Sequence, residues 1–253
     1  ILGVDVAAKA APDGHTMVLT SIAPIAFAPA TPRRMEYDPL KDLAHVAIVA
    51  ATPLVFLVSN ESAAKSVAEV IAAAKAAPGK LNYASGGVGS AAHLCAAALA
   101  LQANIDVVHV PYKGSVEIVP SILSGSTQFA IPIASTAIPQ VQGGKVRALA
   151  VTSAQRMPAL PNVPTLVEVF KTQDLALDAW FGLWAPAGTP APVVDALFKA
   201  VTATYQDPAL RADSEAAGAI VAPSASPAEF TRFIEAETRK LDKLVKAARL
   251  TVQ

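Results

Sequence analysis

The chain has 253 residues, of which 53% are hydrophobic, and its 20 lysines and arginines balance 20 aspartates and glutamates. This length is enough to bury a sizeable core and suits two domains, whereas zero net charge excludes a long-range field that recruits nucleic acid. A membrane-spanning helix is excluded too, because no stretch offers the roughly 18 strongly apolar residues that it needs.

The first residues predict a helix followed by a strand. Ile1–Ala10 has the apolar spacing of a helix tail, and Pro12-Asp13-Gly14 is a turn signal. His15–Thr20 then reads as a buried strand that ends at Ser21. Ligands of open α/β sheets lie just outside the carboxyl ends of strands, so Ser21 is a candidate binding residue. An ordinary loop explains it equally well.

Strand and helix signals then alternate. Two apolar extended runs occupy His45–Ala50 and Leu54–Val58, and Ser66 opens a capping box for a helix that ends before Pro78. This alternation predicts an α/β layered domain with largely parallel strands.

The glycine-rich stretch after Asn82 carries the strongest functional signal. Gly86, Gly87 and Gly89 let the backbone turn sharply, and Ser90 stands where an N-cap belongs, before a helix over Ala91–Gln102. The first N–H groups of a helix lack intrahelical partners, so this end favours an anion such as a carboxylate. The alternative is a tight turn without a ligand, since neither the Rossmann spacing nor a P-loop ending is present.

Further strands are expected at Val107–Val110, Phe129–Ile133 and Val146–Val151. Lys113 follows the first of these strands, where a lysine neutralises a second carboxylate or is simply solvated. Ser135 follows the second strand and opens a short helix. Pro120 is expected to break or kink the helix between these two strands.

The last third of the chain predicts an extended segment and then helices. Proline-rich Ser153–Pro164 is expected to run over a surface, and Trp180–Pro186 is an extended stretch that crosses back to the first domain. Helices follow Thr189-Pro190 and Ser226-Pro227. The predicted lobes are therefore residues 1–80 with 187–253, and residues 81–186, and a double crossing makes a hinge.

Cysteine and histidine positions give no sign of a metal site. Cys95 is the only cysteine, which excludes an intrachain disulfide, and the four histidines, His15, His45, His93 and His109, show no metal-ligand spacing. We therefore expect neither a metal nor a cofactor.

Several of these segments occur in the same order in one known family. They are Lys80–Ser85, Gly89–Leu94, His109–Gly114, Gly144–Thr152, Leu160–Thr165 and Trp180–Pro190. Through them, and over essentially its whole length, the chain resembles the Bug-type (TctC-like) substrate-binding proteins of tripartite tricarboxylate transporters.

The resemblance implies a two-lobed, type II periplasmic-binding-protein-like α/β fold with a hinge and an interlobe cleft. It also implies a monomer in the periplasm that captures a small carboxylic acid and delivers it to integral membrane transporter subunits, without catalysis. Backbone N–H groups and small hydroxyls hold the carboxylate in this family, in agreement with the turn described above. The candidate ligand-binding residues are Ser21, Ser85, Gly86, Gly87, Gly89, Ser90, His93, Lys113 and Ser135.

The chain departs from the family pattern in two respects. Relatives begin with a strand and a Pro-Phe-x-x-Gly-Gly-type loop ahead of the segment that starts at Ala8, so the first strand-helix unit is expected to be missing here. Many relatives also carry aspartate where this chain has Gln128 and Pro132. Ligand contacts near Ile133 to Thr136 are therefore expected to differ.

Two rival functions are weaker. A hydrolase would use Ser90 and His93, but these stand three residues apart at a helix start, with no Gly-x-Ser-x-Gly motif and no assured orienting carboxylate. A phosphate- or nucleotide-binding module lacks the P-loop lysine. Binding without turnover separates these classes.

Overall fold

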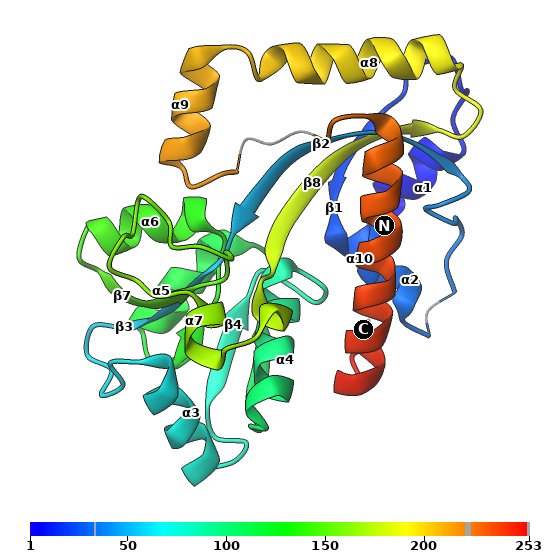
Figure 1. Ribbon diagram of the computed structural model, residues 1–253. Coiled ribbons are helices and arrows are strands. Elements are labelled where there is room, and N and C mark those ends of the chain that lie inside the picture. The colour runs from blue at the N-terminus through cyan, green and yellow to red at the C-terminus, as the bar shows by residue number, and fades with distance from the viewer. Residues whose placement is uncertain (33, 221–223, 252–253) are drawn as a thin grey trace. The chain divides into compact units, whose positions relative to one another are not determined.

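The computed structural model describes residues 1–32, 34–220 and 224–251 (Figure 1). Its internal contacts divide the chain into two compact units, each built on its own sheet. The first unit comprises Ile1–Ala51, Trp180–Glu215 and Ile220–Gln253, and the second comprises Thr52–Ala179 and Ala216–Ala219. The fold is thus α/β, as expected.

The first unit holds a three-stranded sheet in the order β1-β8-β2, in which β1 and β8 are antiparallel. Its elements are α1 (Leu2–Ala8), β1 (Val18–Ser21), a π-helix (Ala23–Phe27), α2 (Ala28–Ala30), β2 (Leu43–Pro53), β8 (Asp178–Pro186), α8 (Ala191–Thr204), α9 (Pro208–Ala216) and α10 (Pro227–Ala248). The strands β2 and β8 carry the chain into and out of the second unit.

Helix α10 forms because its N-terminus is capped and one of its faces is apolar. The Ser226 hydroxyl accepts the Glu229 N–H at 3.1 Å, which confirms the predicted cap. The buried side chains Phe230, Ile234, Leu241 and Val245 share one face. In the core of the first unit, the Phe230 ring lies 5.0 Å from that of Trp184.

The second unit holds a five-stranded sheet in the order β5-β4-β6-β3-β7. Its elements are β3 (Val55–Ser59), α3 (Val67–Ala76), β4 (Asn82–Ser85), α4 (Ala91–Ala103), β5 (Val108–Pro111), a 3-10 turn (Ser115–Glu117), α5 (Ile118–Leu123), β6 (Phe129–Ala130), α6 (Ala134–Gln142), β7 (Val146–Val151), α7 (Leu166–Phe170) and a second 3-10 turn (Gln173–Leu175). Strand β4 is parallel to β5 and β6, whereas β3 is antiparallel to β6 and β7.

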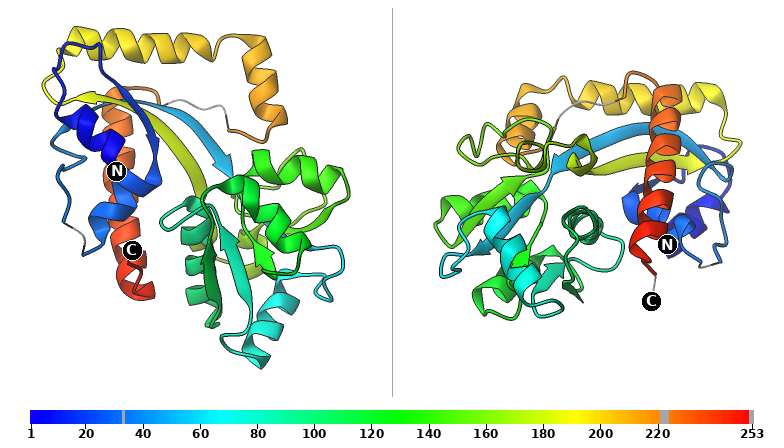
Figure 2. Two further views of the ribbon diagram at one scale, coloured as in Figure 1. Left: turned by 180° about the vertical axis from the view of Figure 1, so that it is seen from behind. Right: turned by 60° about the horizontal axis from the view of Figure 1, so that its bottom comes forward.

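Helices cover both faces of this sheet (Figure 2). Along β3 the side chains alternate, so that Phe56 and Val58 pack with residues of α3 and α4, while Val55 and Leu57 pack with residues of α5 and α6. Both faces of β3 are therefore buried, which explains its uninterrupted apolar sequence.

Several sequence-based expectations need correction. The strands are not largely parallel, because β3 runs against both of its neighbours. Residues 52–80 belong to the second unit rather than the first, since β3 pairs with β6 and β7. The second unit also ends at Ala179 and takes in residues 216–219, so the chain passes between the units more than twice.

Pro120 does not break a helix. It is the third residue of α5, and the N–H that proline lacks has no intrahelical partner at that position. The strand expected over Phe129–Ile133 is shorter than predicted, because only Phe129–Ala130 forms β6. Helix α8 begins one residue later than its predicted cap implied, with Pro190 rather than Thr189 as the N-cap.

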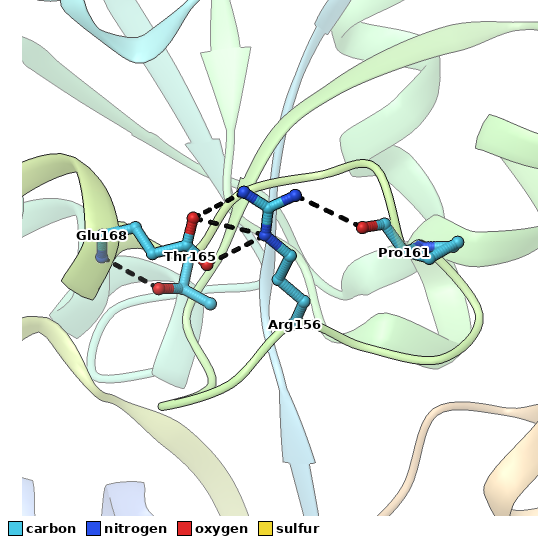
Figure 3. Close-up of polar contacts among 4 residues, drawn as sticks. All are labelled: Arg156, Pro161, Thr165 and Glu168. Atoms are coloured by element: carbon cyan, nitrogen blue, oxygen red, sulfur yellow. Dashed lines mark hydrogen bonds and ion pairs between the residues drawn. The ribbon is translucent and has the colours of Figure 1, made fainter.

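The proline-rich segment Ser153–Pro164 is hydrogen-bonded to α7 (Figure 3). Arg156 donates to both carboxylate oxygens of Glu168, at 2.6 Å for the shortest bond, and to the carbonyl oxygen of Pro161 at 3.4 Å. The fully buried Thr165 caps α7, because its hydroxyl accepts the Glu168 N–H at 2.9 Å. This segment therefore contacts the start of α7.

The cap and the ion pair of this segment are expected to differ in their effect on stability. Thr165→Ala removes a buried N-cap and should cost about 0.5–2 kcal/mol. Arg156→Gln should leave the melting temperature almost unchanged, because the pair is exposed to solvent. Thermal unfolding monitored by circular dichroism compares the two variants, with Thr165→Ser as the control that keeps the hydroxyl. Equal losses for both variants would contradict this ranking.

Candidate functional site

Three loops meet at one edge of the second unit's sheet. Strands β5, β4 and β6 are parallel neighbours, so the loops that follow them lie at the same edge. The loop after β4 carries Gly86 to Ser90, the loop after β5 carries Lys113, and the loop after β6 leads to Ser135. The carboxyl edge of parallel strands is where open α/β sheets bind ligands.

The loop after β4 depends on glycine. Gly87 and Gly89 have φ angles of 124° and 79°, a region that residues with a side chain rarely adopt. A Cβ at Gly86 would come within 3.3 Å of the Ser115 nitrogen in the neighbouring loop. Glycine therefore allows both the turn and the close contact of two loops.

Ser90 is the N-cap of α4, as predicted. Its hydroxyl accepts the His93 N–H at 3.4 Å, which is long for such a bond. No acidic side chain occupies the first turn of α4. The helix start therefore offers N–H groups and positive dipole potential to an anion without competition from its own carboxylate.

Two histidines are hydrogen-bonded to this turn, His93 directly and His109 through Ser85. The His93 Nδ1 atom accepts the Gly89 N–H at 3.0 Å. The His109 Nε2 atom lies 2.6 Å from the Ser85 hydroxyl, which accepts the Gly87 N–H at 3.1 Å. Burial lowers the pKa of both imidazoles to about 4, so both are neutral at pH 7.

The remaining candidate residues are placed as follows. Lys113 is exposed, and its backbone N–H donates to the Glu117 carboxylate at 3.0 Å. Ser135 is exposed in the first turn of α6. Ser21 ends β1 in the first unit, opposite Phe181 of β8. A ligand contact for any of the candidate residues stays a prediction.

Gln128 and Pro132, the two positions where a departure from the family pattern is expected, have separate surroundings. Gln128 lies at the amino end of β4, where its side chain accepts the Asn82 N–H at 2.8 Å. It is therefore at the opposite end of that strand from the turn. Pro132 follows β6 and its carbonyl accepts the Val55 N–H at 2.8 Å, which places it near the carboxyl edge.

His109 was not among the residues chosen from the sequence. It reaches the turn because β5 pairs with β4 in the register that sets His109 opposite Tyr83. No local spacing reveals this pairing, although the short strand before Pro111 marked the segment itself.

The geometry does not favour a hydrolase at Ser90 and His93. The Nδ1 atom of His93 accepts a backbone N–H, and the Ser90 hydroxyl is bonded to the His93 backbone rather than to its ring. Ser85 does lie beside His109, but its side chain is fully buried. A substrate thus has no access to that hydroxyl.

The described residues contain neither a candidate metal site nor a candidate membrane-spanning helix. No cluster of three or more histidine, cysteine, aspartate or glutamate side chains that could hold a metal occurs in residues 1–32, 34–220 and 224–251. In the same ranges no helix combines the length and apolar character required to span a membrane.

The sequence matches the family described as "Tripartite tricarboxylate transporter family receptor" (TctC) over residues 1–250. It is 33% identical over 253 residues to the UPF0065 protein in the tcbD-tcbE intergenic region of Pseudomonas sp. strain P51, covering 99% of this chain and 74% of the relative. It is 31% identical over 241 residues to protein BugT of Bordetella pertussis, covering 95% of this chain and 73% of that protein.

Solved structures agree with these matches. Rpa4515 of R. palustris with adipate superposes with a TM-score of 0.90 at 29% identity, covering 99% of this chain and 83% of that one. The periplasmic binding protein BugD gives 0.88 at 28% identity, covering 100% and 84%. MatC of Rhodopseudomonas palustris with bound malate gives 0.87 at 27% identity, covering 96% and 83%. The expected binding-protein fold is confirmed.

Proposed function

The chain belongs to the tripartite tricarboxylate transporter receptor family, a family of solute-binding proteins rather than enzymes, and from this premise we propose that it binds a small carboxylic acid at the N-terminus of α4. The proposal includes its biological setting. The protein works in the periplasm, as a monomer, and passes its solute to integral membrane subunits of a transporter.

The observation that carries the proposal is the turn from Gly86 to Ser90. It combines a helix N-terminus, a hydroxyl with a long cap bond and two glycines in the left-handed region, all at the carboxyl edge of parallel strands. A carboxylate accepts several N–H groups at once, and such charge-assisted bonds are stronger than neutral ones. The site therefore needs no arginine.

The neighbours indicate the size of the solute. Adipate and malate, bound by Rpa4515 and MatC, are both small dicarboxylates. One carboxylate is assigned to the α4 N-terminus, and the exposed ammonium of Lys113, from the adjacent loop, is available for a second one. We therefore propose a small mono- or dicarboxylate as the solute.

Lys113→Met is expected to weaken the binding of dicarboxylates more than the binding of monocarboxylates. An exposed charge pair contributes roughly 0.2–1 kcal/mol, so the dissociation constant should rise up to about fivefold. Matched monocarboxylates should bind as before, because they lack the second charge. Isothermal titration of each acid in low salt measures the difference. An equal loss for both kinds of acid would remove Lys113 from this role.

Calorimetry of a panel of acids tests the proposed function. Adipate, malate, their monocarboxylate analogues and inorganic phosphate are titrated into the protein, and each mixture is then assayed by chromatography for turnover. We expect saturable binding of a carboxylate with the acid recovered unchanged. Turnover of an ester or amide substrate that Ser90→Ala abolishes would instead support the hydrolase.

A further inference from the structure

We propose that His93 and His109 are positioning residues that fix the Gly87–Gly89 turn and so set the direction of the N–H groups that receive the carboxylate. The proposal rests on the proposed function for its consequence, since the turn is taken as the ligand site. Its structural part concerns the turn alone.

The two histidines restrain, directly or through Ser85, the two glycines of the turn that have positive φ angles. His93 accepts the Gly89 N–H directly, at 3.0 Å. His109 acts through Ser85, whose hydroxyl lies 2.6 Å from its Nε2 atom and accepts the Gly87 N–H at 3.1 Å. A glycine-rich turn is otherwise the most conformationally free kind of backbone, so these bonds determine its shape.

The imidazoles are themselves held by one another. Their planes are nearly parallel, with an interplanar angle of 9° and ring centroids 4.0 Å apart. His93 comes from α4 and His109 from β5, so this stack joins the helix that follows the turn to the strand next to β4. Neither ring can move without disturbing the other.

The stack continues through the core of the sheet. His109 stacks on Tyr83 at 4.9 Å, Tyr83 on Phe129 at 5.6 Å, and Phe129 on Phe56 at 5.0 Å. These four residues lie on β5, β4, β6 and β3, which are successive strands of the sheet. A ladder of rings thus anchors the turn to the rigid centre of the second unit.

The hydrogen bond to Gly89 and the stacking of the two rings require neutral imidazoles. Protonated His93 would present an N–H to the Gly89 N–H, and two stacked cations 4.0 Å apart would repel. The titratable group on the far side of His109 is Tyr83, whose hydroxyl stays neutral because burial raises its pKa. On the chain flanking β5, Asp106 and Glu117 are exposed.

Acid should therefore loosen the turn in a defined window. An unfolded histidine binds a proton below pH 6.5, whereas the folded pKa values are about 4. The unfolded state thus binds more protons between these values, and stability contributed by the neutral pair is complete above pH 6.5 and lost as pH falls toward 4.

Amide hydrogen exchange by NMR on the ligand-free protein tests the proposal. His93→Leu removes the acceptor, and we expect the protection factor of Gly89 to fall at least tenfold. His93→Asn keeps an acceptor oxygen near the Nδ1 position without an ionisable group, so protection should be largely restored. His109→Gln should likewise preserve the protection factor of the Gly87 amide. In the double variant His93→Asn/His109→Gln, the protection factors of Gly87 and Gly89 should not change between pH 7 and 5.

The control is His45→Asn, which alters another buried histidine, bonded to Thr231 and Pro39 in the first unit. It should leave Gly87 and Gly89 unchanged. Undiminished protection of Gly89 in His93→Leu would overturn the proposal. So would protection factors in the double variant that fall between pH 7 and 5 as much as those of the parent. Adipate and malate are titrated in parallel. If the parent binds neither acid, the proposed function fails while the exchange data still decide the positioning role.

Discussion

Phe230→Ala is expected to lower the free energy of unfolding by about 3–5 kcal/mol, the usual cost of deleting a buried aromatic ring. Phe230 is fully buried on α10, and its ring lies 5.0 Å from Trp184 and 5.8 Å from His45. A Cβ at Gly182 would collide with this ring, so β8 and α10 pack without spare room. The truncation therefore leaves a cavity between helix and sheet.

Tryptophan fluorescence in a urea titration measures this effect. Both tryptophans of the chain, Trp180 and Trp184, belong to the first unit, so their emission reports on it selectively. Phe230→Leu is the control and should lose less, since it retains most of the apolar volume. A loss below about 1 kcal/mol for the alanine variant would mean that neighbouring side chains move to fill the cavity, and it would contradict tight packing of β8 against α10.

Ser90→Gly is expected to raise the dissociation constant for a bound carboxylate about ten- to a hundredfold, because a hydrogen bond to a charged group contributes roughly 1.5–3 kcal/mol. Stability should hardly change, since glycine is a fair N-cap. The long 3.4 Å cap bond supports this separation, as little cap energy is at stake. Isothermal titration with adipate and malate gives the affinity, and thermal unfolding gives the stability.

The first unit supplies a matched control for this experiment. Ser226 caps α10 in the same manner, with its hydroxyl 3.1 Å from the Glu229 N–H. Ser226→Gly should affect stability about as little and leave affinity unchanged. If Ser90→Gly binds like the parent, Ser90 is only a cap and the backbone alone holds the anion.

Local chemistry made many helices predictable. Ser66 and Ser226 each accept the N–H three residues later, as their capping boxes indicated, and α4 covers the predicted span within one residue. Helices α7 and α9 were missed, because neither shows a long apolar face in the sequence. Caps and periodicity act over a few residues, and they reveal only what those residues decide.

Strand direction and unit boundaries were less accessible. The apolar run at β3 predicted a buried strand, but its antiparallel pairing with β6 and β7 depends on distant partners, from Phe129 opposite Val58 to Val151 opposite Val55. Because of the same pairing, residues 52–80 belong to the second unit and not, as predicted, to the first. Alternation of helix and strand signals carries no information on strand direction.

The local structure of the candidate site was predictable where its residues are contiguous in the chain. Glycines, Ser90 and the following helix lie next to one another in the chain, so their roles could be read together. His109 could not be linked to Ser85 from the sequence, because their contact follows from the register between β4 and β5. A ligand contact of His93 stays a prediction, and in the structure its Nδ1 atom accepts the Gly89 N–H.

The most direct test of a carboxylate at the α4 N-terminus is an NMR titration of the isotope-labelled protein with adipate and with malate. We expect the amide protons of Ala91 and Ala92, in the first turn of α4, to shift downfield together, with one saturation curve, as they donate to the anion. Saturable binding that leaves these amides unmoved, and shifts others instead, would contradict this assignment.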